Sequence, residues 1–222
     1  MSEFFMGLDL GQASDYTAIS VLEEAQIPTG KAMLDKRGAA IGPEMVQGYY
    51  LRHLERPRLG TSYPAIVARV KDLLSKPPLK GAATLIVDAT GVGAPVVDML
   101  RRADVGASIV PVTITGGSAV SRDPAQGYGV PKRDLVSNLQ VLFQSGRLKI
   151  ADKLPEAQIL VKELLGFQVK ISLDAHDSYG AWREGTHDDL VLSVALAAWY
   201  AQTVGRRMPF GWKKDPRGEV RR

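Results

Sequence analysis

The sequence predicts an α/β domain with a mixed central sheet and helices on both faces. Apolar runs typical of buried strands alternate along the chain with segments whose apolar residues recur every three or four positions, as on one face of a helix. Strands joined directly by turns run antiparallel, whereas a strand that follows a helical crossover lies parallel to its neighbour. Both orientations are therefore expected. The 222 residues, 45% apolar and 23% charged, suffice for one domain with a substantial core.

The first three strands are expected at residues 4–10, 17–24 and 45–54. FFMGLDL is almost wholly apolar, TAISVLEE follows it across a tight loop that contains Gly11, and the third segment is rich in residues that favour strands. Residues 25–43 contain Gly, Pro and charges of both signs. We expect them to form a long loop that joins the second and third strands.

Helices and strands are expected to alternate in the middle of the chain. Residues 63–76 carry apolar side chains at helical spacing until Pro77 ends the pattern. ATLIVDA, residues 83–89, is apolar up to its aspartate, which is typical of a strand covered on both faces. Residues 94–102 are expected to form a helix with a proline in its first turn, and residues 107–114 another strand.

The last part of the chain is expected to be mainly helical. Residues 116–129 are rich in Gly and Ser and should form a loop. Apolar periodicity predicts helices at 131–144 and 154–165, a strand at 167–173 and a closing helix at 188–200.

Basic residues are concentrated at the C-terminal end. Residues 205–222 hold seven of the 28 Lys and Arg residues and two of the 24 acids, so this segment carries a net charge of +5 and residues 1–204 carry −1. It lacks apolar periodicity, so we expect residues 1–204 to form the domain and residues 205–222 to be a flexible basic tail. Such a tail could contact DNA phosphates, contact an acidic protein surface, or remain solvated.

Four aspartates are the candidate catalytic and metal-binding residues. We expect the strands that end at Asp9 and Asp88 to be central neighbours, about 4.8 Å apart, and sites in open α/β sheets form at the carboxyl ends of strands. Asp188 and Asp189 open the closing helix, so three or four acids could converge. Close carboxylates resist ionisation unless a cation lies between them. Oxygen ligands in a chain without cysteine favour Mg²⁺ or Mn²⁺. Two such ions about 4 Å apart can activate water and stabilise the leaving oxygen of a phosphodiester.

Structural interpretations of these acids remain open at this point. Asp188 could be an N-cap, Asp189 a favourable charge at the helix dipole, and Asp9 an Asx-turn residue. His187 could be an accessory metal ligand or a proton donor to the leaving oxygen, or it could simply shape the start of the helix.

Four further residues are candidates for DNA contact. Lys132 and Arg133 begin a helix, where a bound phosphate would satisfy both the helix dipole and the two cations, although Asp134 offers them a local partner. Gly91 and Gly93 follow the aspartate of the fourth strand and could give a DNA backbone close access to it. They could equally be turn glycines.

The sequence also indicates the cellular compartment of the protein. The longest apolar run, residues 190–201, is too short to span a bilayer, and no charged-then-apolar signal segment opens the chain. We expect a cytosolic protein with no membrane partner. The absence of cysteine excludes disulfides, thiolate metal sites and thiol nucleophiles.

Five stretches that span roughly residues 6–201 carry a family resemblance: GLDLG, LIVDATGVGAP, YGVPKRDLVSNL, GRLKI and GTHDDLVLSVALA. Together they resemble the nuclease domain of phage large terminase subunits. The HDDLV element is the more specific motif, and DxG alone is weak. The resemblance implies a ribonuclease H-like fold in which Asp9, Asp88 and Asp189 bind metal. Asp188 would be an accessory or competing ligand. It also implies cleavage of double-stranded DNA with Mg²⁺ or Mn²⁺ during genome packaging, in the cytoplasm of a bacterial host.

The chain departs from a complete large terminase in one respect. Such proteins also carry an ATPase domain with a phosphate-binding P-loop, and no GxxxxGK[ST] pattern occurs here. Translocation is therefore not predicted for this chain alone. An ATPase domain, a small terminase subunit, and a portal or capsid protein are the implied partners.

Three other functions remain to be distinguished from this one. The first is a Holliday-junction resolvase-type nuclease of the same fold, which usually has glutamate where this chain has Asp88. The second is an actin-like or sugar-kinase ATPase, which DLGQASDYT resembles, although such proteins need two domains of this kind and 222 residues are too few. The third is a non-catalytic DNA-binding module.

Overall fold

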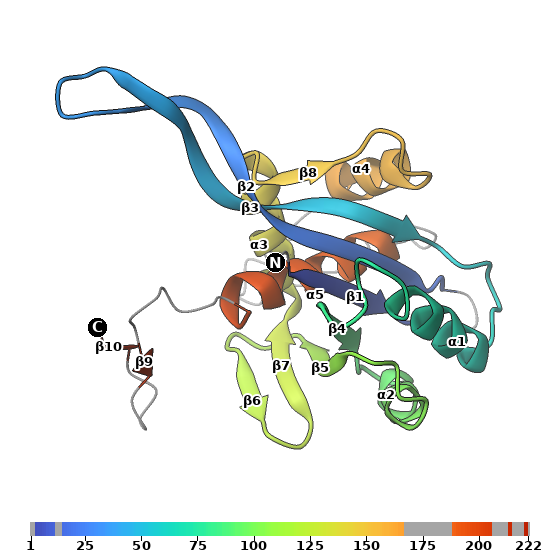
Figure 1. The fold of residues 1–222 in the computed structure, drawn as a ribbon. Coiled ribbons are helices and arrows are strands. Elements are labelled where there is room, and N and C mark those ends of the chain that lie inside the picture. Colours follow the sequence, from blue (N-terminus) through green and yellow to red (C-terminus); the bar gives the residue numbers. More distant parts are fainter. Residues whose placement is uncertain (1–2, 12–14, 167–187, 206–212, 215–219, 222) are drawn as a thin grey trace, which may run out of the picture.

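The computed structural model describes residues 3–11, 15–166, 188–205, 213–214 and 220–221. Its centre is a mixed eight-stranded sheet with helices packed on both faces (Figure 1), which confirms the predicted fold class. The strands of this sheet are β1 (Phe4–Asp9), β2 (Ala18–Leu34), β3 (Ala40–Glu55), β4 (Ala83–Asp88), β5 (Ser108–Thr115), β6 (Ser121–Asp123), β7 (Gly127–Pro131) and β8 (Leu148–Ile150). The helices are α1 (Tyr63–Leu74), α2 (Gly93–Arg102), α3 (Lys132–Gln144), α4 (Ala157–Gly166) and α5 (Asp189–Thr203).

The sheet is mixed because two strands run against the others. In the order β6-β7-β5-β4-β1-β2-β3-β8, β2 and β6 are antiparallel to their neighbours and the remaining adjacent pairs are parallel. β1 and β4 lie side by side at the centre, with Leu8 opposite Val87. The expectation that these strands are central neighbours is confirmed, and the next residue on each of them is an aspartate.

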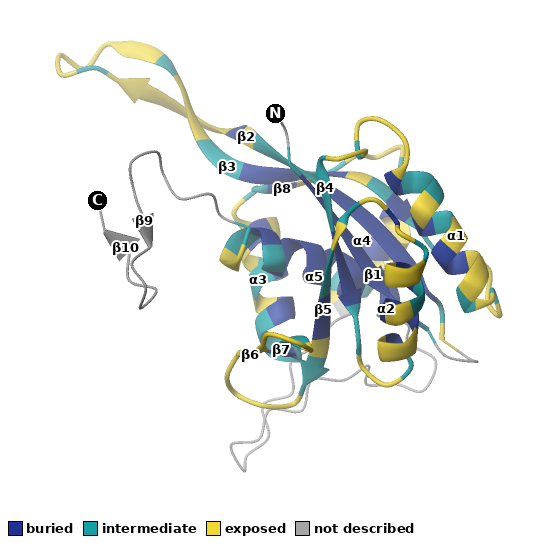
Figure 2. Ribbon diagram, turned by 60° about the horizontal axis from the view of Figure 1, so that its bottom comes forward, coloured by how far each residue is buried: buried dark blue, intermediate teal, exposed yellow. Residues whose placement is uncertain are grey.

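Two hydrophobic cores cover the two faces of the sheet. One lies against α3, α4 and α5, and the other against α1 and α2. β1 contributes to both, since Phe5 belongs to the first core and Met6 and Leu8 belong to the second. A strand buried on both faces needs apolar side chains at successive positions. Figure 2 shows β1 buried along its length.

Helix α5 is buried on nearly all sides, and twelve of its 15 residues are buried. It packs between the sheet and helices α3 and α4. At Gly7 of β1 the helix backbone comes so close that a Cβ atom would lie 1.8 Å from the carbonyl oxygen of Ser193. The sheet and α5 can therefore meet at this distance only because residue 7 has no side chain.

The expectation that residues 25–43 form a loop is wrong, because β2 and β3 continue through most of this segment as a two-stranded arm (Figure 1). In the described part of the chain, no third strand pairs with the part of the arm that projects from the sheet. A proline, which has no N–H to donate, or a shift in register can therefore occur there without breaking hydrogen bonds to another strand. A tight turn closes the arm. In this turn Asp35 Oδ1 accepts the N–H groups of Arg37 and Ala39 at 2.8 and 2.9 Å.

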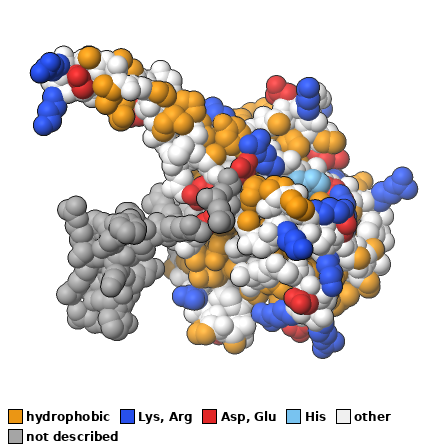
Figure 3. Space-filling model, viewed as in Figure 1, with side chains coloured by type: hydrophobic (Ala, Val, Ile, Leu, Met, Phe, Trp, Pro, Cys, Tyr) orange, Lys and Arg blue, Asp and Glu red, His pale blue; other side chains and the backbone are white. Residues whose placement is uncertain are grey.

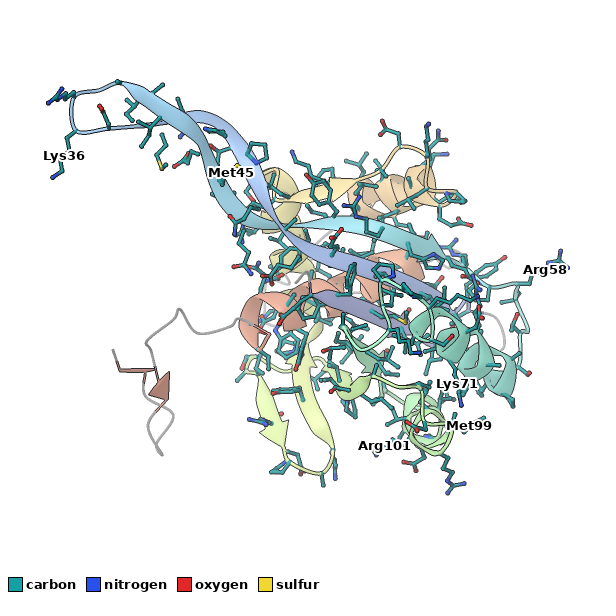
Figure 4. The ribbon with its side chains drawn as sticks, in the orientation of Figure 1. Lys36, Met45, Arg58, Lys71, Met99 and Arg101 are labelled. Atoms are coloured by element: carbon teal, nitrogen blue, oxygen red, sulfur yellow. The ribbon has the colours of Figure 1, made fainter. Side chains whose placement is uncertain are left out.

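The arm projects from the end of the sheet opposite to the aspartates. It begins beyond Glu23, which pairs with the first residue of β1, whereas Asp9 is the last residue of β1. Figure 3 shows apolar side chains along the arm, and Figure 4 shows Lys36 at its tip. Among its large apolar side chains, Leu34 and Ile41 are each 59% exposed. Beyond the buried Ile27 at its base, the arm therefore lies outside both cores.

Smaller differences from the expectation lie in short strands. Residues 116–129, expected as a loop, contain β6 and the beginning of β7. β8 was not expected, because three residues are too few to show a period. The strand expected at 167–173 lies outside the described residues.

Within the basic tail the structure describes two short strands. β9 (Lys213–Lys214) pairs antiparallel with β10 (Val220–Arg221) in a separate sheet. None of the described helices has the length and apolar character needed to cross a bilayer.

Replacing Gly7 with alanine tests the contact between β1 and α5. We expect the free energy of unfolding of Gly7→Ala to fall by about 3 kcal/mol, since the added methyl group must push strand and helix apart. Urea denaturation followed by circular dichroism measures this change. Gly116→Ala is the matched control, because a Cβ there meets no atom within 4 Å. Equal stability of the two variants would contradict the role given to Gly7.

Candidate active site

Asp9 and Asp88 lie at the carboxyl edge of the sheet, close enough for their carboxyl groups to act on each other. Burial raises the pKa of Asp9, which is 6% exposed, well above its usual value. The negative charges of Asp88, Asp189 and Asp188 raise it further, in that order. The nearby carboxyl group of Asp88 thus contributes to the rise in the pKa of Asp9, after burial.

The turn after β4 holds the Asp88 carboxylate in place. The Thr90 N–H donates to Asp88 Oδ1 at 2.8 Å. Burial raises the pKa of Asp88, and the bonds from Thr90 and the charge of Lys132 oppose that rise. A Cβ at Gly93 would lie 2.0 Å from the Asp88 carbonyl oxygen, and Gly91 has a φ of 56°. Both glycines therefore have structural reasons for their positions, and their role in DNA contact stays a prediction.

Asp188 and Asp189 lie at the start of α5, at the same edge of the sheet as Asp9 and Asp88. Asp188 occupies the N-cap position but makes no side-chain capping bond, so its interpretation as an N-cap alone is wrong. Its Oδ2 instead accepts a hydrogen bond from Lys132 Nζ at 2.7 Å. Asp189 is 6% exposed, and its charge acts on Asp9. The structure thus gathers all four predicted acids at the ends of β1, β4 and α5.

A buried ion pair between Arg56 and Glu163, which the sequence did not reveal, lies beside Asp189. Arg56 directly follows β3 and Glu163 belongs to α4, and their side chains are 12% and 8% exposed. Arg56 Nη2 contacts Glu163 Oε1 directly and lies 3.8 Å from Asp189 Oδ2. Glu163 Oε2 accepts the N–H of Val191, in the first turn of α5, at 3.2 Å. Burial raises the pKa of Glu163 to about 7, although Arg56 and the Val191 amide oppose this rise.

The predicted DNA-contacting cations at the start of α3 have different surroundings. Lys132 turns toward the acids through its bond to Asp188. Arg133 instead donates to the Ser118 carbonyl oxygen at 2.7 Å and lies 3.3 Å from Asp134. Their contact with DNA stays a prediction. His187, the possible accessory ligand, lies outside the described residues.

The donor chemistry of the acidic cluster fits a hard divalent cation. Within the described ranges, no three acidic or histidine side chains are already arranged so that they could hold an ion. The raised pKa of Asp9 favours its protonated form, and protonation relieves part of the repulsion between the two carboxyl groups. A divalent cation would relieve the same repulsion more completely, and carboxylate oxygens are the ligands that Mg²⁺ and Mn²⁺ prefer.

Comparison with known proteins gives matches only among solved structures, since no family model and no curated protein matches the chain. The large terminase nuclease from thermophilic phage G20c is 24% identical, over 90% of this chain and 82% of that one, with a TM-score of 0.56. A mutant nuclease domain of the large terminase subunit of bacterial virus Sf6, solved with manganese and beta-thujaplicinol, is 13% identical over 88% and 87%, with a TM-score of 0.60. The large terminase of bacteriophage HK97 is 11% identical over 90% of this chain and 40% of that one, with a TM-score of 0.52.

These likenesses concern the fold, because sequence identity to each structure is low. They extend over nearly the whole chain and come from several phages. The family resemblance of the sequence is therefore confirmed at the level of the fold, and the chain has the ribonuclease H-like fold of large terminase nuclease domains.

Proposed function

We propose that this chain is a metal-dependent endonuclease that cuts double-stranded DNA, as the nuclease part of a phage packaging terminase. The convergence of four aspartates at one edge of the sheet carries this proposal. The shared fold with terminase nuclease domains supports it, and one of those domains was solved with manganese. A buried acid such as Asp9, whose pKa is raised by burial and by neighbouring acids, is typical of functional sites.

Asp9, Asp88 and Asp189 are the proposed metal ligands, and Asp188 is an accessory ligand. Two Mg²⁺ or Mn²⁺ ions, when bound, supply an activated water and neutralise charge on the leaving oxygen. Because the pKa of Asp9 is raised, metal binding at its carboxylate is linked to its deprotonation. Asp188 can contact an ion through Oδ1 while its Oδ2 accepts the bond from Lys132.

The proposed substrate fits the basic groups of the chain, and the proposed partners follow from the family resemblance. Lys132 and Arg133 at the start of α3, and the basic tail, supply cations for DNA phosphates. Gly91 and Gly93 add no side chains to the turn beside Asp88. The proposed partners are a packaging ATPase domain, a small terminase subunit, and a portal or capsid protein, in the cytoplasm of the bacterial host.

Substitution of the two α5 acids tests the assignment of ligands. We expect Asp189→Asn to abolish cleavage of linear duplex DNA in Mn²⁺, because a carboxylate ligand is lost. Asp188→Asn should slow cleavage about tenfold, as expected for a group that acts beside the primary ligands. Initial rates of plasmid nicking measure both effects, and fluorescence anisotropy should show that DNA binding persists.

Asp98→Asn is the control, since this side chain is 62% exposed on α2. Cleavage by Asp189→Asn at the rate of the unchanged protein would contradict the assignment. Strong preference for four-way junctions over linear duplex would favour a resolvase-type nuclease instead.

The pH dependence of stability tests the burial of Asp9. An acid whose pKa is raised by folding stabilises the fold fully below its usual pKa of about 4, and this contribution is lost as pH rises through the raised pKa. Each unit of the shift corresponds to about 1.4 kcal/mol. In EDTA, the stability of the unchanged chain should therefore fall relative to Asp9→Asn as pH rises above about 4.

Urea denaturation at several pH values measures this difference. Mn²⁺ at neutral pH should raise the stability of the unchanged chain and have little effect on Asp9→Asn. A pH dependence that is the same in the two proteins would show that folding does not raise the pKa of Asp9.

Removal of residues 206–222 tests the role of the basic tail. Gly205 is retained because its backbone packs on Phe5, where a Cβ would lie 2.9 Å from the ring. We expect the shortened chain to bind duplex DNA several-fold more weakly and with a flatter salt dependence, since fewer phosphate counterions are released. Fluorescence anisotropy over a range of salt concentrations measures both. A full-length variant with the tail Lys and Arg residues changed to Gln should match the truncation, and unchanged affinity at low salt in either protein would contradict this role.

A further inference from the structure

Arg56 lies between two carboxylates but is bound mainly to one of them. Its Nη2 atom contacts Glu163 Oε1 directly, whereas Asp189 Oδ2 lies 3.8 Å from the same nitrogen. The guanidinium also lies over the Tyr16 ring, 5.1 Å from its centroid. The largely buried guanidinium of Arg56 is thus held 3.8 Å from an oxygen of Asp189, a proposed metal ligand.

The orientation of Glu163 explains this unequal sharing. One of its oxygens forms the ion pair with Arg56, and the other accepts a hydrogen bond from the Val191 N–H in the first turn of α5. The first amides of a helix have no partner within the helix, and they favour a nearby anion. Glu163 is therefore anchored to the same helix turn as Asp189, and its position relative to that carboxylate is defined.

The charge of Arg56 makes its position important for metal binding. Arginine stays protonated at any accessible pH, and charges that are largely buried attract each other more strongly than exposed ones. Without the negative charge of Glu163, the nearest anion that the structure shows for Arg56 is Asp189. A guanidinium paired with Asp189 would compete with a metal ion for the same oxygens.

We propose that Glu163 is a positioning residue that holds Arg56 away from Asp189 and so keeps this carboxylate available to metal ions. Glu163 sets the metal affinity through Arg56 and is not itself a ligand. This inference rests on the proposed function, because it assumes that Asp189 binds metal. The nearby Arg58, two residues further along the chain, makes no such pair with any residue that the structure describes and extends into solvent (Figure 4).

The test compares Mn²⁺ binding in the full chain and in three variants. The variants are E163Q, R56Q and the double variant R56Q/E163Q, and isothermal titration calorimetry gives the Mn²⁺ dissociation constant at about pH 8, above the Glu163 pKa of about 7. Circular dichroism confirms that each variant is folded. E55Q is the matched control, because Glu55 also pairs with an arginine, Arg69 of α1, at 2.8 Å.

We expect E163Q to raise the Mn²⁺ dissociation constant about tenfold, which corresponds to ~1.4 kcal/mol. The double variant should return to within about twofold of the unchanged chain, since the competing cation is gone as well. R56Q alone should bind Mn²⁺ at least as tightly as the unchanged chain. At saturating Mn²⁺, the E163Q cleavage rate should approach that of the unchanged chain, and E55Q should match it throughout.

A purely structural role for the pair predicts a different pattern, in which all three variants bind Mn²⁺ more weakly. That result, or an E163Q dissociation constant equal to that of the unchanged chain, would overturn the inference while leaving the proposed function intact, provided that the unchanged chain binds Mn²⁺ and cleaves DNA. If the unchanged chain does neither, the proposed function fails and the inference fails with it. If E163Q does not fold, R56Q and the double variant decide alone, and weaker binding in both would overturn the inference.

Discussion

The close packing of α5 on β1 is the constraint on which the candidate site depends. The two backbones meet at Gly7 and Ser193, at a distance that no side chain at residue 7 would allow. Asp9 lies two residues beyond this contact on the strand, and Asp189 lies one turn before it on the helix. A strand and a helix fixed at one point in this way bring their acidic ends to the same edge of the sheet. The glycine and the aspartates therefore form a single structural unit.

Repulsion among the acids is relieved in three different ways around this edge. Burial and the neighbouring acids raise the pKa of Asp9, which favours its protonated form, Asp188 accepts a hydrogen bond from the ammonium group of Lys132, and Asp189 lies 3.8 Å from the Arg56 guanidinium. A site that is costly to keep charged without metal is suited to binding metal, because the ions then remove the cost. The same feature makes the edge a poor contributor to stability.

Particular elements show where reasoning from sequence succeeds and where it fails. The apolar runs around residues 5 and 86 predicted central parallel strands, because burial on both faces demands apolar side chains at every position. The Gly- and Pro-containing segment at 25–43 was misjudged, because these residues disfavour strands inside a sheet but are tolerated in a ribbon that has no further neighbours. β8 could not be predicted, because it pairs along only three residues and so shows no periodic pattern in the sequence.

The fold class, the central strands that end at Asp9 and Asp88, and the two aspartates that open α5 could all be predicted from the sequence, because burial leaves a periodic signal in the chain and parallel neighbours end at the same edge. Which cation lies beside which acid could be seen only in the folded chain. Arg56 in LERPR and Glu163 in VKELLG look like ordinary solvated charges, and Lys132 and Asp188 stand 56 residues apart. Nothing local distinguishes a solvated charge from a buried partner, because the distance between such side chains is set by how helices and strands pack and not by the residues beside them.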